Sequence, residues 1–154
     1  MKYFLDTEFI EDGRTIDLIS IALVTDDGRE LYCENAECDF RLASEWVKTN
    51  VIRPLIGGTA QYSRVAIREK VRSFCTGRPE FWGYYADYDW VVFCQLFGRM
   101  VDLPKGWPMY CRDIKQFCDD LGNPKLPKQG KGEHFALADA YWIKKSYEFL
   151  ESMK

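Results

Sequence analysis

The chain has 154 residues, about the length of one typical domain, and 47% of them are apolar, which is enough for a proper core. Its net charge of −3 argues against a protein that coats long stretches of nucleic acid by neutralising phosphates. That charge leaves open a short contact in which bound metal ions supply the positive charge. Six cysteines without a CxxC pair, together with a single histidine, argue against a zinc site. We expect one domain over residues 1–154.

The N-terminal sequence bears on the cellular compartment of the protein. It begins directly with a strand-like run and lacks the basic and then apolar segments of a signal peptide. No apolar stretch approaches the roughly 20 residues that span a bilayer. We therefore expect a cytoplasmic protein with reduced thiols and no membrane partner.

Three strands are predicted first, over residues 2–10, 15–25 and 29–33. The turns between them carry Asp-Gly at residues 12–13 and 27–28. Asp-Gly between two strand-like runs is a hairpin signal. The opening of the chain is therefore predicted to be an antiparallel meander.

Two helices are predicted next, over residues 40–56 and 63–76. Ser63 is the expected N-cap of the second helix. An apolar stripe at helical spacing supports that helix, and it consists of Ile67, Val71, Phe74 and Cys75. The near-continuous apolar and aromatic run over residues 80–86 predicts a buried central strand.

The rest of the chain predicts a helix over residues 90–100, a short strand over 109–112 and a helix that ends at Gly122. Residues 123–133 lack periodicity and predict a loop, and a terminal helix follows over 137–153. Hairpin strands followed by alternating helices and strands predict an α/β fold, in which α-helices flank a mixed β-sheet.

Acidic residues recur beside the predicted elements. Asp6 and Glu8 stand two positions apart near the end of the first strand, so their side chains project from one face. Asp87 and Asp89 follow the buried strand, and Asp139 lies one turn into the terminal helix. Clustered carboxylates without Cys or His ligands suit hard cations such as Mg²⁺ or Mn²⁺.

The only histidine, His134, precedes Asp139 by five residues. Five residues turn by about 500° in an α-helix, so the two side chains would not share a helix face. We therefore place His134 on the loop that enters the helix, over the site that Asp139 helps to build. A neutral imidazole accepts a proton near neutral pH. Each residue alone also fits a structural role, but their joint arrangement indicates a metal-dependent hydrolase.

Three motifs resemble those of the DEDDh 3′–5′ exonucleases, the ribonuclease T and DnaQ-like group of the ribonuclease H-like superfamily. Residues 4–9 read FLDTEF, and residues 134–139 read HFALAD, which matches H-x-A-x-x-D and is the most specific signal in the chain. The second motif, an aromatic residue followed by Asp at a helix start, is matched by Tyr88-Asp89-Trp90. Its lead-in, YYAD, departs from the usual Asn-rich sequence, so Asp87 rivals Asp89, which we favour.

The resemblance covers almost the whole chain, and it is closest to the compact actinobacterial and phage-type 3′–5′ exoribonucleases. It implies a ribonuclease H-like fold and release of nucleoside 5′-monophosphates from single-stranded RNA 3′ ends or overhangs. It implies that two Mg²⁺ or Mn²⁺ ions are held by four carboxylates, and these are Asp6, Glu8, Asp89 and Asp139. It further implies that His134 is the general base and that the protein is a homodimer.

The loop before His134 carries three lysines, Lys125, Lys128 and Lys131. We expect it to act as a mobile lid whose lysines meet substrate phosphates. A solvated basic loop with no contact to substrate is the equal alternative.

Residues beside the first motif are candidates for contact with the terminal nucleotide. Phe9 and Ile10 are expected to bracket the base, since stacking tolerates any base, and packing in the core is the alternative for both. Recognition of RNA needs a polar group near the terminal 2′-hydroxyl, and the backbone around Thr7 is the candidate.

Other functions remain open at this point. A non-catalytic nucleotide- or RNA-binding module would keep the fold, but it would have no need of His134 as a proton acceptor. A 3′–5′ exonuclease acting mainly on DNA would use the same residues. A small-molecule phosphatase of the haloacid-dehalogenase type would need Asp where Glu8 stands.

Overall fold

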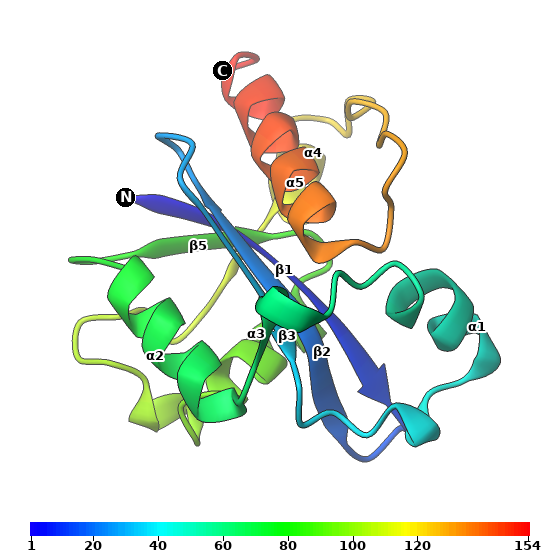
Figure 1. The fold of residues 1–154 in the computed structure, drawn as a ribbon. Coiled ribbons are helices and arrows are strands. Elements are labelled where there is room, and N and C mark those ends of the chain that lie inside the picture. Colours follow the sequence, from blue (N-terminus) through cyan, green and yellow to red (C-terminus); the bar gives the residue numbers. More distant parts are fainter.

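A six-stranded mixed sheet forms the centre of the computed structural model, which describes residues 1–154 (Figure 1). The strand order is β4-β3-β2-β1-β5-β6. The pairs β1–β2 and β2–β3 are antiparallel, and β1–β5, β3–β4 and β5–β6 are parallel. The strands are β1 (Lys2–Glu11), β2 (Ile16–Thr25), β3 (Glu30–Asn35), β4 (Gln61–Tyr62), β5 (Glu80–Gly83) and β6 (Arg112–Asp113).

Helices cover both faces of this sheet. They are α1 (Glu45–Val47), α2 (Arg64–Phe74), α3 (Asp87–Gln95), α4 (Ile114–Asp120) and α5 (Ala136–Glu151). In Figure 1, α5 lies on one side of the strands, and α2 and α3 lie on the other. This arrangement confirms the predicted α/β fold, a ribonuclease H-like mixed sheet flanked by helices. None of the helices is both long and apolar enough to cross a membrane.

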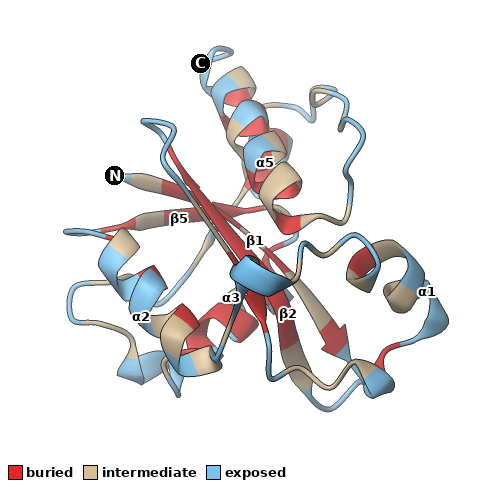
Figure 2. Cartoon of the chain, in the orientation of Figure 1, coloured by how far each residue is buried: buried red, intermediate tan, exposed pale blue.

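The alternation of side chains along β1 divides the core into two layers. Leu5 is buried in the cluster that includes Ile67 of α2 and Phe93 of α3. Phe4 is buried in the cluster that includes Ile143 of α5. Figure 2 shows the buried residues concentrated on the strands and on the sides of the helices that face them. Even-numbered residues of β1 therefore face α5, as expected for a strand in a sheet covered on both sides.

The predicted meander and the second helix are confirmed. Ser63 caps α2 by accepting a hydrogen bond from the Ala66 N–H at 3.2 Å. The first strand is longer than predicted, since it continues to Glu11. Asp6 lies near the middle of β1, and three more residues of the strand follow Glu8.

The strand predicted over residues 80–86 ends early, at Gly83. The chain turns there so tightly that a Cβ atom on Gly83 would lie 2.5 Å from the Cβ of Ala86. Tyr85 takes a left-handed conformation in the same turn, with a φ of 51°. The turn carries the chain directly into α3, which begins at Asp87 and not at Trp90 as predicted.

The single helix predicted over residues 40–56 is wrong. The segment is divided into a 3₁₀ turn (Phe40–Leu42), α1 and a π-helical turn (Lys48–Ile52). Ser44 starts a new helical segment because its hydroxyl accepts the Val47 N–H at 3.2 Å. The strand predicted over 109–112 lies instead at Arg112–Asp113, and β4 was not predicted because two residues show no periodicity.

The tight turn after β5 gives a prediction about stability. Gly83→Ala should lower the free energy of unfolding by about 1–3 kcal/mol, because the added methyl group forces Ala86 and the start of α3 to move. The control is Gly130→Ala, where nothing lies within 4 Å of the added Cβ and the change should have little effect. Urea unfolding measures both, and equal free energies would refute the steric argument.

Candidate active site

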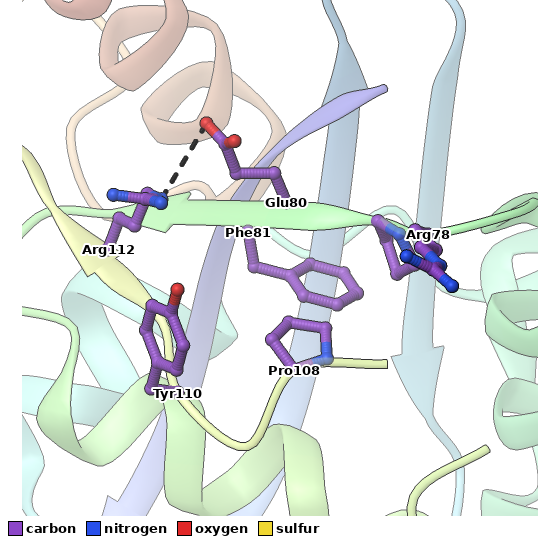
Figure 3. Close-up of a pocket in the computed structure, with 7 residues that line it drawn as sticks. Arg78, Glu80, Phe81, Pro108, Tyr110 and Arg112 are labelled. Carbon is purple, nitrogen blue, oxygen red and sulfur yellow. Dashed lines mark ion pairs between the residues drawn. The ribbon is translucent and has the colours of Figure 1, made fainter. Parts of the chain in front are cut away.

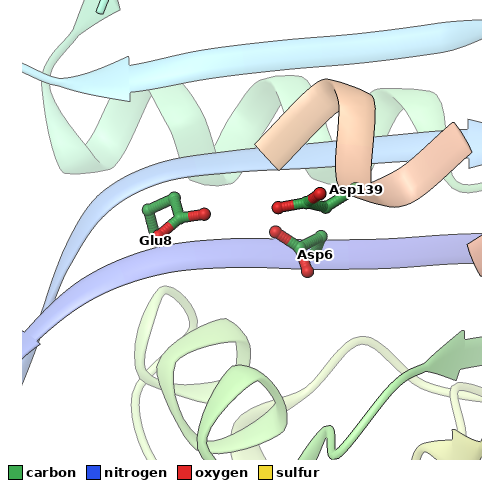
Figure 4. A group of neighbouring side chains, drawn as sticks. All are labelled: Asp6, Glu8 and Asp139. Atoms are coloured by element: carbon green, nitrogen blue, oxygen red, sulfur yellow. The ribbon is translucent and has the colours of Figure 1, made fainter. Parts of the chain in front are cut away.

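Two carboxylates of β1 and one of α5 converge on the α5 face of the sheet. Asp6, Glu8 and Asp139 each offer an oxygen atom, and these atoms all lie within 4.8 Å of one another. Figure 4 shows the first two on β1 and the third on α5, with their carboxylates turned toward a common space. Residues 6 and 8 meet there because of strand alternation, and Asp139 because α5 crosses this face.

Their closeness makes the charged forms of these groups unfavourable. Burial, and then the charges of neighbouring carboxylates, raise the pKa of Asp6 well above its usual value. Burial, followed by the charges of Asp139 and Asp89, raises the pKa of Glu8 to about 8. Burial also raises the pKa of Asp139. A divalent cation among them would remove this penalty, and an oxygen-only donor set fits Mg²⁺ or Mn²⁺.

Asp89 lies beside this group, in the first turn of α3. Its Oδ1 accepts hydrogen bonds from the Thr7 N–H at 2.9 Å and from the Thr7 hydroxyl at 2.6 Å. Burial raises the pKa of Asp89 to about 6, and the two bonds from Thr7 oppose that rise. Its second oxygen accepts no hydrogen bond from the chain, and its charge acts on both Asp6 and Glu8. Asp87 is exposed, so the geometry favours Asp89 over its rival.

The carboxylate of Asp139 is held at both oxygens. Its Oδ2 accepts the backbone N–H of His134 at 2.9 Å, and its Oδ1 accepts the side-chain amide of Gln129. His134 has a φ of 68°, which turns its N–H back toward the first turn of α5. Residues before α5 therefore orient the acid that the helix carries.

The His134 side chain lies at the edge of the site. It is half-buried, and its ring meets the exposed ring of Trp46 edge-on at 4.9 Å between centroids. His134 precedes α5, as predicted from the spacing to Asp139. The imidazole is therefore accessible from solvent and close to the carboxylates.

A cavity of about 190 Å³ has Asp6, His134 and Asp139 in its wall, whereas Glu8 and Asp89 do not line it. Five further residues of that wall were not singled out from the sequence, and they are Tyr84, Gln129, Glu133, Trp142 and Ile143. Trp142 lies three positions after Asp139 on α5, so helical spacing alone would have found it. Gln129 lies in an aperiodic loop, where no sequence pattern marks it.

The residues predicted to contact the terminal nucleotide lie in different surroundings. The Thr7 hydroxyl is bonded to Asp89, and Phe9 is partly buried with its ring 5.9 Å from that of Tyr88. Ile10 is 8% exposed and packs with Ile19, so its position matches the core alternative and not a contact with a base. Lys131 is exposed and forms no ion pair, which leaves its ammonium group available.

A second cavity, of about 150 Å³, lies along β5 between Arg78, Phe81, Tyr110 and neighbouring side chains (Figure 3). Its one carboxylate, Glu80, pairs with Arg112 at 3.7 Å. Unlike the first cavity, it contains no histidine and none of the three clustered carboxylates.

Fold and site together define an α/β protein of ribonuclease H-like architecture with an acidic centre suited to hard cations. The chain belongs to the family described as the 3′-5′ exoribonuclease Rv2179c-like domain, which it matches over residues 1–150. It is similar to the 3′-5′ exoribonucleases MT2234.1 and Rv2179c of two Mycobacterium tuberculosis strains, CDC 1551 / Oshkosh and ATCC 25618 / H37Rv. Each is 41% identical to it over 146 residues, which cover 91% of this chain and 87% of the relative.

The raised pKa of Glu8 gives a prediction about stability and pH without divalent ions. Folding moves this pKa from 4.5 to about 8, so the folded state keeps a proton that the unfolded state releases, and Glu8 becomes increasingly destabilising between these pH values. Glu8→Gln removes that penalty. At pH 8 in EDTA its free energy of unfolding should exceed wild type by at least about 1 kcal/mol, or roughly 2–4 °C in melting temperature.

The gain should shrink as the pH falls toward 5, because Glu8 is then protonated in both states. Asp120→Asn, at an exposed acid outside the site, is the control and should show no such trend. A Glu8→Gln variant that is less stable than wild type at pH 8 would contradict the repulsion argument.

Proposed function

We propose that this protein is a 3′–5′ exoribonuclease of the DEDDh type. It removes nucleoside 5′-monophosphates one at a time from single-stranded 3′ ends or overhangs of RNA. The observation that carries the proposal is the convergence of Asp6, Glu8 and Asp139 beside an accessible His134. Membership of a family whose relatives are named 3′-5′ exoribonucleases supports the same reaction and favours RNA over DNA.

Two Mg²⁺ or Mn²⁺ ions would be held by Asp6, Glu8, Asp139 and the free oxygen of Asp89. When bound, such ions activate the attacking water and stabilise the leaving oxygen of a phosphodiester. The carboxylates would contribute by holding the ions in place. Asp89 is fixed by Thr7, and Asp139 is fixed by His134 and Gln129, so neither needs to reorganise on binding.

His134 would act as the general base. Its neutral imidazole accepts the proton of the attacking water at a ring nitrogen, the water oxygen bonds to phosphorus, and the bond from phosphorus to the 3′-oxygen of the preceding nucleotide breaks. The 3′-oxygen takes up a proton, and the terminal nucleotide leaves as a 5′-monophosphate. The position of His134 at the solvent edge supports this role, since the proton then passes to bulk water.

Further parts of the proposal concern binding and assembly. The exposed loop lysines Lys125, Lys128 and Lys131 would contact the substrate phosphates, and Phe9 would contact the terminal base. We also propose a homodimer in the cytoplasm. The six cysteines are free thiols, which is in keeping with a reducing compartment.

A metal-dependent ladder is the direct test. End-labelled RNA and DNA oligonucleotides are incubated with Mg²⁺, Mn²⁺ or EDTA. We expect stepwise shortening of RNA that needs both a divalent ion and a free 3′-hydroxyl. Binding of RNA without shortening would support the non-catalytic module instead, and equal or faster shortening of DNA would support a DNA exonuclease.

His134→Ala should lower kcat by about 10²–10⁴-fold, because the general base is lost. Its affinity for Mn²⁺ and for nucleoside monophosphate should stay close to wild type, as measured by calorimetry. Full activity in this variant would remove His134 from the mechanism.

The two neighbouring aspartates provide a matched pair. Asp89→Asn should lower kcat by at least about 10²-fold, because a charged ligand of the ions is lost. Asp87→Asn changes an exposed side chain two positions away and should stay within a few-fold of wild type. Melting temperatures show whether both variants fold. The opposite order of activities would transfer the metal role to Asp87.

A further inference from the structure

Two buried side-chain polar atoms in the structure have no hydrogen-bond partner, and they are the hydroxyl oxygens of Ser20 and Ser146. Ser20 is 1% exposed and Ser146 is 0% exposed, so neither hydroxyl reaches bulk solvent. Buried polar groups without partners are rare in native proteins because they are costly. An unpaired buried hydroxyl next to a functional site therefore suggests a partner that moves into place when the site is loaded.

Only Ser20 lies next to the acidic centre. It is on β2, where it is the cross-strand partner of Glu8 on β1 and of Glu34 on β3. Directly opposite residues of antiparallel strands project from the same face, with Cβ atoms about 4.5–5.5 Å apart. The three side chains therefore form one row across the sheet, with the hydroxyl between two carboxylates.

Glu34, at one end of this row, is already satisfied. Its carboxylate accepts the backbone N–H groups of Ile56 at 2.6 Å and of Gly57 at 2.8 Å. It also accepts the hydroxyl of Tyr32 at 2.8 Å. Glu34 thus fastens the loop after the π-helical turn to β3 and has little need of a fourth donor.

Glu8, at the other end, accepts no hydrogen bond from the chain, although it belongs to the group that fits a divalent ion. An unpaired donor and an unpaired acceptor therefore face the same side of the sheet as direct neighbours. A carboxylate that binds a metal ion keeps lone pairs for a second-shell donor.

We infer that Ser20 is a positioning residue that donates its hydroxyl proton to the Glu8 carboxylate when Glu8 binds a divalent ion. The inference rests on the proposed function, because it assigns the partner of a metal ligand. Hydrogen bonds to charged carboxylates are stronger than neutral ones, and they hold the oxygen that faces the ion in one orientation. Loss of such a donor typically costs about 10–100-fold in metal affinity.

The test measures Mn²⁺ binding to the purified protein by calorimetry and by the rise in melting temperature, so that it does not depend on activity. Ser20→Ala should weaken Mn²⁺ binding by about 10-fold. Its metal-free melting temperature should be unchanged or slightly higher, because the removed hydroxyl had no partner. Ser20→Thr keeps the hydroxyl and should bind Mn²⁺ more tightly than Ser20→Ala.

Ser146→Ala is the matched control, since it removes the other unpaired buried hydroxyl from a position on α5 outside the acidic group. It should bind Mn²⁺ like wild type. Tyr32→Phe tests the other polar neighbour of Ser20, whose phenolic oxygen is the alternative acceptor for the Ser20 proton. Because the Tyr32 proton goes to Glu34, this variant should also keep wild-type affinity.

Different failures point to different errors. Wild-type affinity for Mn²⁺ in Ser20→Ala, or equal losses in Ser20→Ala and Ser146→Ala, would overturn the role of Ser20 and leave the proposed function intact. Equal losses of Mn²⁺ affinity in Ser20→Ala and Tyr32→Phe would mean that Ser20 does not act on Glu8 alone and that the Tyr32 hydroxyl is needed as well, which would overturn the inference. Failure of the wild-type protein to bind Mn²⁺ at all would overturn the proposed metal centre as well.

Discussion

The packing of helices against both faces of β1 is the constraint on which the site depends. Because side chains alternate, Leu5 and Thr7 face α2 and α3, whereas Asp6 and Glu8 face α5. Placing α5 over the acidic side of the strand brings Asp139 to the same point. The packing that buries the core therefore also brings three carboxylates together. A shift of β1 by one residue would turn its core side chains and its acidic side chains to the opposite faces.

Gathering these acids lowers the stability of the metal-free protein, and the surrounding structure offsets part of that penalty. Asp89 receives two hydrogen bonds from Thr7, and Asp139 receives one each from His134 and Gln129. Glu8 receives none, and its pKa is raised to about 8. Asp6 receives none either, and Glu8 is the one of the two whose cross-strand neighbour, Ser20, has a hydroxyl without a partner. A cation bound among these acids would stabilise the folded protein.

Local sequence signals were sufficient to predict an element where a turn residue, a capping residue or a regular spacing of apolar residues decides its structure. Asp-Gly turns predicted the meander, and Ser63 predicted the start of α2. Prediction failed where packing overrides a local pattern. The apolar run after Glu80 continues past Gly83, but β5 ends there, in a turn that leaves no room for a side chain between Gly83 and Ala86. The prediction of one helix over residues 40–56 missed that Ser44 starts a separate turn.

The sequence by itself marked the candidate residues of the site, through the spacing of Asp6 and Glu8 on a strand and the match of residues 134–139 to H-x-A-x-x-D. Only the tertiary structure decided which of Asp87 and Asp89 approaches the other acids, since that depends on how α3 enters against Thr7. The tertiary structure also places Gln129 beside Asp139 and Ser20 opposite Glu8. These contacts join residues through loop closure and strand pairing, and no local pattern in the chain encodes them.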